Sequence, residues 1–240
     1  MKNKTLARYS RHILLKEIGG SGQKKLTSKK ILVVGLGGLG CPLCLYLVSS
    51  GVGTIGIIDG DKIDLTNLNR QIIFSKKKVG KLKVKVAKKF LKKFNSEVKI
   101  KIFPFMLDKT NSDNIISKFD IILDGTDNFE TRYIINKSCH KFQKPLISGA
   151  LGRWEGQLMF FNYKENNICL ECVYPPTKKK ISIENCEDGG IFSPLSGVIG
   201  ILMASEALKF IVGSGKNFVN KLFIIDILNN ENKSFDIASN

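Results

Sequence analysis

A glycine-rich turn between a short apolar strand and an apolar helix is the feature that most constrains the fold of this chain. Residues 31–34 are all apolar, as in a buried parallel strand, and Gly35-Leu-Gly-Gly-Leu-Gly40 follows directly. We expect a helix over about 39–50 and a second strand over 54–58. Glycines here let the backbone approach a phosphate, and the helix N-terminus offers free N–H groups. The pattern predicts a βαβ unit that binds a nucleotide, and alone it does not separate NAD from ATP.

Residues 31–58 also carry no charge over 28 positions, a length that could span a membrane. They include seven glycines and one proline, and they divide into pieces of different period, so a βαβ unit explains them better. Residues 1–8 contain no apolar stretch of the signal-peptide kind, and six cysteines are too few for a disulfide scaffold. We therefore expect a soluble, cytoplasmic protein without a membrane partner.

The net charge of +17, from 38 basic and 21 acidic residues, raises the question of whether the chain binds nucleic acid. Only five of the basic residues are arginines, the side chain on which base recognition usually depends. A solvated, lysine-coated surface explains the charge better, and nucleic acid is not an expected partner.

Alternating strand and helix patterns predict an α/β fold, a Rossmann-like, mostly parallel sheet with flanking helices. Further strands are expected over 98–103 and 121–123, with helices over about 6–18, 79–95 and 129–142. The pattern changes at Gly156, where strands over 157–161 and 222–227 and a helix over 198–212 predict an antiparallel extension. We expect a single domain over 1–240, with nucleotide binding in about 1–150, carrier binding in about 151–240 and a mobile loop over about 174–190.

A cluster of polar residues follows the second strand and favours ATP over a dinucleotide. Asp59 closes that strand 24 residues after Gly35, where a carboxylate can accept hydrogen bonds from ribose hydroxyls. Close packing of amide and guanidinium donors suits a triphosphate. The residues expected to bind it are Asp61, Asn67, Arg70 and Gln71. A capped polar loop is the simpler alternative.

Lys83 is the one lysine of the helix over 79–95 that falls near the middle of its apolar face, when residues are placed at 100° intervals. A buried ammonium without a partner is costly, so Lys83 should meet an anion, and a nucleotide phosphate is the natural candidate. The alternative is a side chain that extends along the apolar face to reach water.

Asp127 and Asn128 directly follow an apolar strand, in the segment Asp124-Gly-Thr-Asp-Asn128. Ligands of open parallel sheets bind beyond the carboxyl ends of the strands, so Asp127 is placed to hold Mg²⁺. Asn128 can cap the next helix without excluding that role.

Together these segments resemble the ThiF/MoeB/HesA family, relatives of the ubiquitin-activating enzymes. The resemblance covers most of the chain, from Arg8 to about Asp236. The matching motifs are Gly35-Leu-Gly-Gly-Leu-Gly40, Asp64-Leu-Thr-Asn-Leu-Asn-Arg-Gln71, Asp124-Gly-Thr-Asp-Asn128, Glu155-Gly-Gln157 and Pro194-Leu-Ser-Gly-Val-Ile-Gly200.

The resemblance implies an adenylyltransferase that uses ATP and Mg²⁺ to activate the C-terminal glycine of a small ubiquitin-like sulfur-carrier protein. It also implies a homodimer, in which Arg11 reaches the partner's ATP, and a sulfur-donor protein as a further partner. The segments 8–15 and 69–74 favour the thiamine-type carrier, with the molybdopterin type as the alternative. An NAD-dependent oxidoreductase is the more distant alternative. The glycine-rich turn itself makes Gly35, Gly37, Gly38 and Gly40 candidates for nucleotide binding. Carried over by motif, Gly38 contacts nucleotide, Asp59 binds ribose, Asn67, Arg70 and Lys83 bind phosphates, and Asp127 binds Mg²⁺.

Three cysteines are candidates for chemistry. Cys169 and Cys172 form a C-x-x-C pair, half of a tetrahedral zinc site, but the second pair that relatives carry near the C-terminus is absent, which makes zinc doubtful. In thiamine-type relatives a cysteine at the position of Cys186 bonds covalently with the carrier. Acidic neighbours of Cys186 disfavour a reactive thiolate, so its role stays open. The pair Cys41 and Cys44 opens an apolar helix, where core packing is expected rather than redox chemistry.

Overall fold

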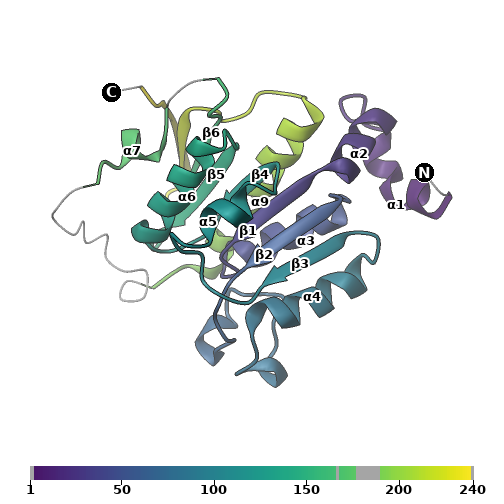
Figure 1. Ribbon diagram of the computed structural model, residues 1–240, viewed down its shortest axis with the longest axis horizontal. Helices are drawn as coiled ribbons and strands as arrows, with labels where there is room; N and C mark the ends of the chain where they lie inside the picture. Colours follow the sequence, from purple (N-terminus) through teal and green to yellow (C-terminus); the bar gives the residue numbers. More distant parts are fainter. Residues whose placement is uncertain (1–2, 166–167, 177–189, 239–240) are drawn as a thin grey trace.

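Figure 1 shows the computed structural model, which describes residues 3–165, 168–176 and 190–238. One eight-stranded sheet runs through it in the order β3-β2-β1-β4-β5-β6-β7-β8. The first five strands in this order are parallel to one another, and β6, β7 and β8 each pair antiparallel with the strand before. Their bounds are β1 Lys30–Val34, β2 Thr54–Ile58, β3 Lys99–Phe103, β4 Ile121–Asp124, β5 Leu146–Leu151, β6 Glu155–Phe161, β7 Lys221–Asp226 and β8 Glu231–Asp236.

Helices cover both faces of this sheet and bury one apolar core on each side. In Figure 1, α3 and α9 lie behind the sheet and α5 and α6 in front of it. Leu47 and Met203 belong to the core behind, and Ile116 and Ile135 to the core in front. The helices are α1 Asn3–Ile13, α2 Gly19–Ser28, α3 Gly40–Ser49, α4 Lys83–Phe94, α5 Ser112–Ile116, α6 Phe129–Lys141, α7 Leu170–Val173 and α9 Ser193–Val212, with short 3₁₀ turns η1 Leu65–Asn67 and η2 Lys76–Lys78.

This architecture confirms the predicted fold class. The glycine-rich turn joins β1 to α3, and the change in pattern at Gly156 marks the start of the antiparallel extension. The strands β5 and β8, the helices α5 and α7, and the first turn of α9 were not expected from the sequence.

The helix α9 is, among the described residues, the one helix long and apolar enough to cross a membrane. In the most apolar 18-residue stretch of this helix, 56% of the residues are buried within the protein. It packs against α3, β5 and β6, which is the position of a core helix in a globular fold.

Two expected helices have other bounds in the structure. The predicted helix over 6–18 ends at Ile13, and the glycines taken as its end instead begin α2, which packs Leu26 under α9. Gly19 has φ +57°, so it supports a turn between two helices rather than a terminus of the segment.

The helix expected over 79–95 begins only at Lys83. Gly80, with φ +80°, and a bridge between Lys62 and Leu82 hold the preceding residues in an extended turn. Phe90 and Phe94 fall on the same side of the helical wheel as Lys83, where the apolar pattern predicts burial, but they are 40% and 46% exposed. The buried stripe of α4 is therefore narrower than the apolar pattern predicts.

Candidate functional site

The carboxyl ends of three adjacent strands meet where the strand order reverses. Val34, the last residue of β1, pairs with Ile58 of β2 on one side and with Asp124 of β4 on the other. The three loops that follow therefore leave the sheet at one level. In open α/β sheets, ligands bind at such a switch point.

Two glycines of the turn are required by close backbone approach. Gly35 has φ +85°, and a Cβ there would lie 2.9 Å from the carbonyl oxygen of Gly125. A Cβ on Gly40 would lie 2.2 Å from the carbonyl oxygen of Gly35. The turn after β1 is thus folded on itself and pressed against the loop after β4, which brings the N-terminus of α3 to the switch point.

Asp59 fixes the neighbouring loop through two backbone hydrogen bonds. Its Oδ2 accepts from the N–H of Leu36 at 2.7 Å, and its Oδ1 accepts from the N–H of Asp61 at 2.8 Å. Burial raises the pKa of the Asp59 carboxyl, and the Lys83 ammonium and the two N–H donors oppose that rise. In the structure both carboxylate oxygens of the residue expected to bind ribose already accept backbone hydrogen bonds.

Lys83 is buried, and its ammonium meets an anion, as the helical wheel predicts. The partner is the carboxylate of Asp61, with Nζ to Oδ2 at 2.8 Å. The Lys83 side chain is 7% exposed and that of Asp61 49%. An ammonium has three N–H donors, and this contact uses one of them.

The segment after η1 brings Arg70 and Gln71 against the glycine turn. A Cβ on Gly38 would lie 3.4 Å from Cδ of Arg70 and 3.0 Å from Cβ of Ser196, in the first turn of α9. The Arg70 guanidinium donates to the carbonyl of Thr66 and to the side chain of Asn69, each at 3.1 Å.

Gln71 and Asn67 differ in how their polar groups are used. Gln71 is buried beside Gly37, and its Oε1 has no hydrogen-bond partner among the described residues. Asn67 accepts from the N–H of Asp64 at 3.2 Å, within a capping box of η1. The alternative of a capped polar loop therefore holds for Asn67. The unpaired oxygen of Gln71 instead favours a ligand near this side chain.

The loop after β4 is held by a side chain that the sequence interpretation missed. Arg132 of α6 is 6% exposed, and its Nη2 donates to the carbonyls of Thr126, at 2.5 Å, and Gly149, at 2.9 Å. It joins this loop to β5. Asp127, in the same loop, is exposed, and Asn128 caps α6 through the N–H of Thr131 at 2.9 Å. An exposed carboxylate beside the switch point can receive Mg²⁺.

Arg11 lies on α1, near the amino ends of the strands, whereas this loop follows the carboxyl end of β4. Tyr9, two residues earlier on α1, contacts Gly51, which precedes β2, and Arg8 donates to the carbonyl of Phe94 at the end of α4. Arg11 is exposed there. Within one chain the structure does not bring Arg11 to the switch point.

The cysteines separate into buried and half-buried ones. Cys41 and Cys44 are fully buried, and burial raises the pKa of the Cys41 thiol to about 12, as expected for core packing. Cys169 and Cys172 flank the start of α7, half-buried, and the N–H of Cys169 donates to Sγ of Cys172 at 3.4 Å. Within the described ranges no third His, Cys, Asp or Glu joins them. Cys186 and most of the loop expected over 174–190 lie outside the described residues.

Comparison with known proteins finds a matching family and relatives with similar sequences. The ThiF family matches residues 9–240. The chain is 42% identical over 226 residues to "Adenylyltransferase and sulfurtransferase MOCS3" of Culex quinquefasciatus and 40% identical to the protein of that name from Anopheles gambiae. Each match covers 94% of this chain but 51% of the relative, so the chain spans about half the length of these relatives.

Solved structures agree on the fold. A structure described as E. coli MccB with ATP covers 96% of this chain and 71% of its own, with a TM-score of 0.83 and 27% identity. A second, of MccB with MccA-N7isoASN, covers 100% and 74%, with a TM-score of 0.85 and 27% identity. PaaA superposes with a TM-score of 0.81 at 22% identity over 100% of this chain and 76% of its own, a likeness of fold alone.

Proposed function

Because this chain belongs to the ThiF family, we propose that it is an ATP-dependent adenylyltransferase that activates the C-terminal glycine of a small ubiquitin-like carrier protein. The observation that carries the proposal is the convergence of the glycine turn, Arg70, and the Lys83–Asp61 pair beside the switch point of the sheet. The relatives named adenylyltransferases support the reaction class.

The residues at the switch point fit a triphosphate. The amide of Gln71 lies beside Gly37 with its buried oxygen unpaired, and the close backbone approach at Gly40 brings the N-terminus of α3 to the same place, which supports a ligand there. Arg70 and Lys83 would bind phosphate oxygens. Asp59 would bind the ribose hydroxyls through the carboxylate lone pairs that its two backbone hydrogen bonds leave free. Asp127 would hold Mg²⁺, which neutralises phosphate charge when bound.

The reaction asks for positioning and charge neutralisation rather than proton transfer. A carboxylate is ionised at neutral pH, so the carrier's terminal oxygen can attack the α-phosphorus without a general base. A bond forms between that oxygen and phosphorus, and the bond to pyrophosphate breaks. Arg70 and Lys83 can stabilise the charge that moves onto the leaving group.

Of the two carriers expected from the sequence, the molybdopterin type is the better supported. The relatives named MOCS3 favour it over the thiamine type, to which the segments 8–15 and 69–74 pointed. We therefore propose the molybdopterin-type carrier as the substrate, docked on the part of the chain over about 151–240. The cytoplasmic location and a sulfur-donor partner remain parts of the same proposal.

A homodimer is the assembly that we propose. Large apolar side chains next to Arg11 are exposed, among them Leu14 at 73% and Leu15 at 51%. Leu15 also lines a hollow of about 410 Å³ with Tyr46 and Ile201. An apolar surface of this kind beside α1 supports a contact between copies that carries Arg11 to the partner's switch point.

ATP–pyrophosphate exchange tests the activity. Exchange should appear with a molybdopterin-type carrier and ATP, and not with the same carrier lacking its terminal glycine. Asp127→Ala should abolish it, because the Mg²⁺ ligand is lost. Exchange with a thiamine-type carrier alone would reverse the choice of substrate. A folded protein that gives no exchange with either carrier would refute the adenylyltransferase.

A further inference from the structure

The segment around α4 is strongly basic. Residues 76–101 hold 12 of the 38 basic residues of the chain, all lysines, and one acidic residue, Glu97. Four of the lysines, at helical spacings of three, four and seven, form one stripe on the outer side of α4. We call this stripe the lysine face, and it consists of Lys85, Lys88, Lys89 and Lys92.

The lysine face has no carboxylate partner among the described residues. Within the described ranges its one polar contact is from Nζ of Lys92 to the carbonyl of Ser96, at 3.0 Å. Elsewhere on the surface, lysines do pair, as Lys141 does with Asp113 and Lys221 with Asp236. Like charges three and four residues apart on a helix destabilise it by about 0.2–0.5 kcal/mol a pair. The stripe is therefore held at a small cost in stability that an anionic partner would relieve.

The same four lysines line a hollow of about 470 Å³, together with Ile102 of β3. The hollow is lined by the hydrocarbon stems of the lysines and by the isoleucine, so its interior is apolar while its rim carries four ammonium groups. A matching ligand needs an apolar group to enter the hollow and negative charges around that group.

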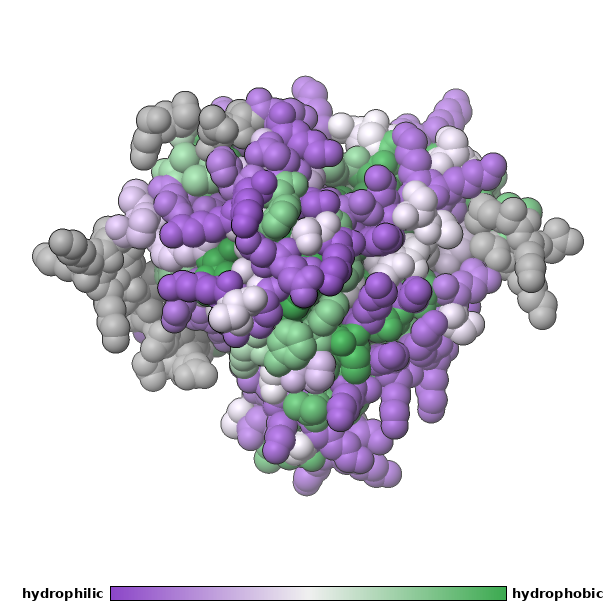
Figure 2. Space-filling model, viewed as in Figure 1, coloured by the Kyte–Doolittle hydropathy of each residue, from purple (hydrophilic) through white to green (hydrophobic). Residues whose placement is uncertain are grey.

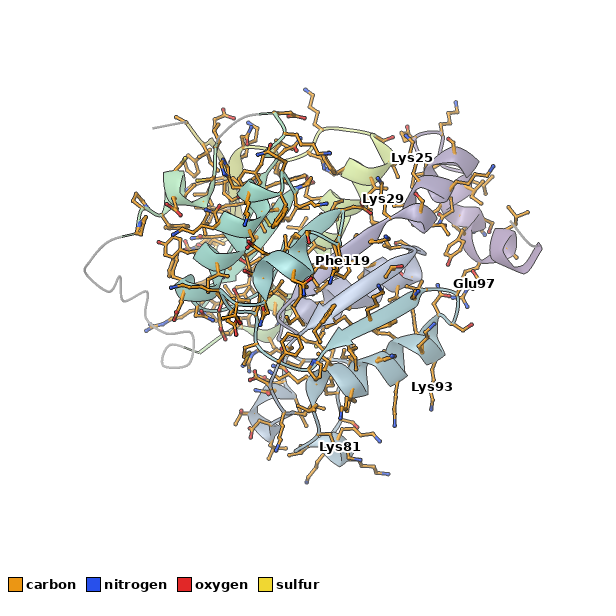
Figure 3. The ribbon with its side chains drawn as sticks, in the orientation of Figure 1. Lys25, Lys29, Lys81, Lys93, Glu97 and Phe119 are labelled. Atoms are coloured by element: carbon orange, nitrogen blue, oxygen red, sulfur yellow. The ribbon has the colours of Figure 1, made fainter. Side chains whose placement is uncertain are left out.

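This surface lies apart from the carrier-binding part of the chain. In the sheet, β3 is the outer strand at one end, and β8 is the outer strand at the other. In Figure 3, side chains with nitrogen tips project from α4 away from the sheet, between the labelled Lys81 and Lys93, and Figure 2 shows hydrophilic side chains along that border. A partner bound there would leave the switch point and the strands β5–β8 accessible.

We propose that the lysine face is the docking site for an acidic segment of a partner protein, in which aspartates and glutamates flank one apolar side chain. A nucleic-acid backbone would use the ammonium groups but not the apolar hollow. Base stacking finds no platform there, because Phe90 lies about 200° around the helix from Lys88, on the opposite side. The combination of charge and hollow therefore favours a protein segment.

A binding assay with a defined peptide tests this proposal. The probe is a fluorescein-labelled peptide, Gly-Glu-Asp-Leu-Glu-Asp-Gly, and its partner probe has glycine in place of leucine. The test variant combines Lys85→Glu, Lys88→Glu, Lys89→Glu and Lys92→Glu. The matched control combines Lys24→Glu, Lys109→Glu, Lys118→Glu and Lys137→Glu, which are exposed lysines outside both this face and the part proposed to bind the carrier, so both variants change the net charge equally.

At about 50 mM salt, where surface charges are weakly screened, the test variant should bind the leucine peptide at least about tenfold more weakly than the unaltered chain. The control should lose no more than about threefold, and the glycine peptide should bind the unaltered chain several-fold more weakly. Both quadruple variants should retain carrier-dependent exchange, because no substituted lysine lies at the switch point.

Two outcomes would overturn the proposal. Equal losses in both variants would mean that total charge, not this face, binds the peptide. Tighter binding of single-stranded oligo(dT) than of the leucine peptide, lost in the test variant only, would assign the face to nucleic acid.

Discussion

At the scale of single residues, Lys83 is the side chain whose substitution most directly tests the site. Lys83→Met should reduce ATP–pyrophosphate exchange by about 100-fold or more, because a buried cation beside the phosphates is lost. The matched control is Lys85→Met, the exposed lysine two residues later, which should keep exchange within about twofold, since it touches none of the site residues. Exchange is compared at equal folded fraction, established by urea unfolding. Near-normal exchange in Lys83→Met would remove Lys83 from the phosphate-binding set.

Asp59 makes a prediction about pH. Burial raises the pKa of the Asp59 carboxyl above the usual 3.8, so the folded chain binds the carboxyl proton more tightly than the unfolded chain does. The stability of the unaltered chain relative to Asp59→Asn should therefore fall as pH rises from about 3.8 through the raised value, and should level off above it. Urea midpoints of both proteins across that range measure the difference. If the unaltered chain instead gained stability relative to the variant, the contacts with Lys83 and the two N–H groups would outweigh burial.

Single residues also show how far the sequence leads. The burial of Lys83 follows from helical spacing alone, because the apolar residues of the segment 79–95 fall on the same side of the helical wheel. Arg132 could not be found this way. It donates a hydrogen bond to the carbonyl of Gly149, 17 residues away, and only the tertiary placement of α6 on the sheet creates that contact. Local patterns predict which face of a helix turns toward the core, whereas long-range contacts decide how wide the buried stripe is and what a buried polar group meets.

At the scale of elements, the glycine turn should be sensitive to a single methyl group. Gly40→Ala should lower the free energy of unfolding by about 2–3 kcal/mol, because the new Cβ would overlap the carbonyl oxygen of Gly35. Gly197→Ala is the matched control. That position lies within α9 with open space around it, and alanine should stabilise the helix by about 0.5–1 kcal/mol. The midpoints of urea unfolding give both values. A neutral Gly40→Ala would show that the turn can relax.

The elements that the sequence predicted well are those with a buried, periodic pattern and a sharp end. Residues 31–34, 55–58 and 121–123, which make up most of β1, β2 and β4, carry no polar side chain, and each run is followed at once by glycine or aspartate. The helix α2 was missed because its sequence, Gly-Gly-Ser-Gly at the start, is unfavourable to a helix in isolation. Leu26 and the buried Gln23, which donates to the carbonyl of Ser50 at 2.8 Å, stabilise it through tertiary contacts.

At the scale of the whole molecule, the position of Arg11 is explained best by a second copy of the chain, whose site it would reach. The loops that we propose to bind phosphate follow the carboxyl ends of the strands, and α1 packs near the opposite, amino ends. A guanidinium near those ends can take part in the chemistry only in the site of another subunit. The exposed leucines beside it give such a contact an apolar surface.

Mixed dimers test this arrangement. Neither Arg11→Ala nor Lys83→Met should be active alone, but their co-expression should restore about a quarter of normal exchange, because half of the dimers are mixed and one of their two sites is intact. Co-expressed Lys83→Met and Asp127→Ala should show no recovery, since both residues belong to the same site of one chain. Recovery in this second pair as well would mean that Lys83 and Asp127 do not act within one site. Absence of recovery in the first pair, with dimers demonstrated by sedimentation, would return Arg11 to the role of an ordinary surface charge on α1.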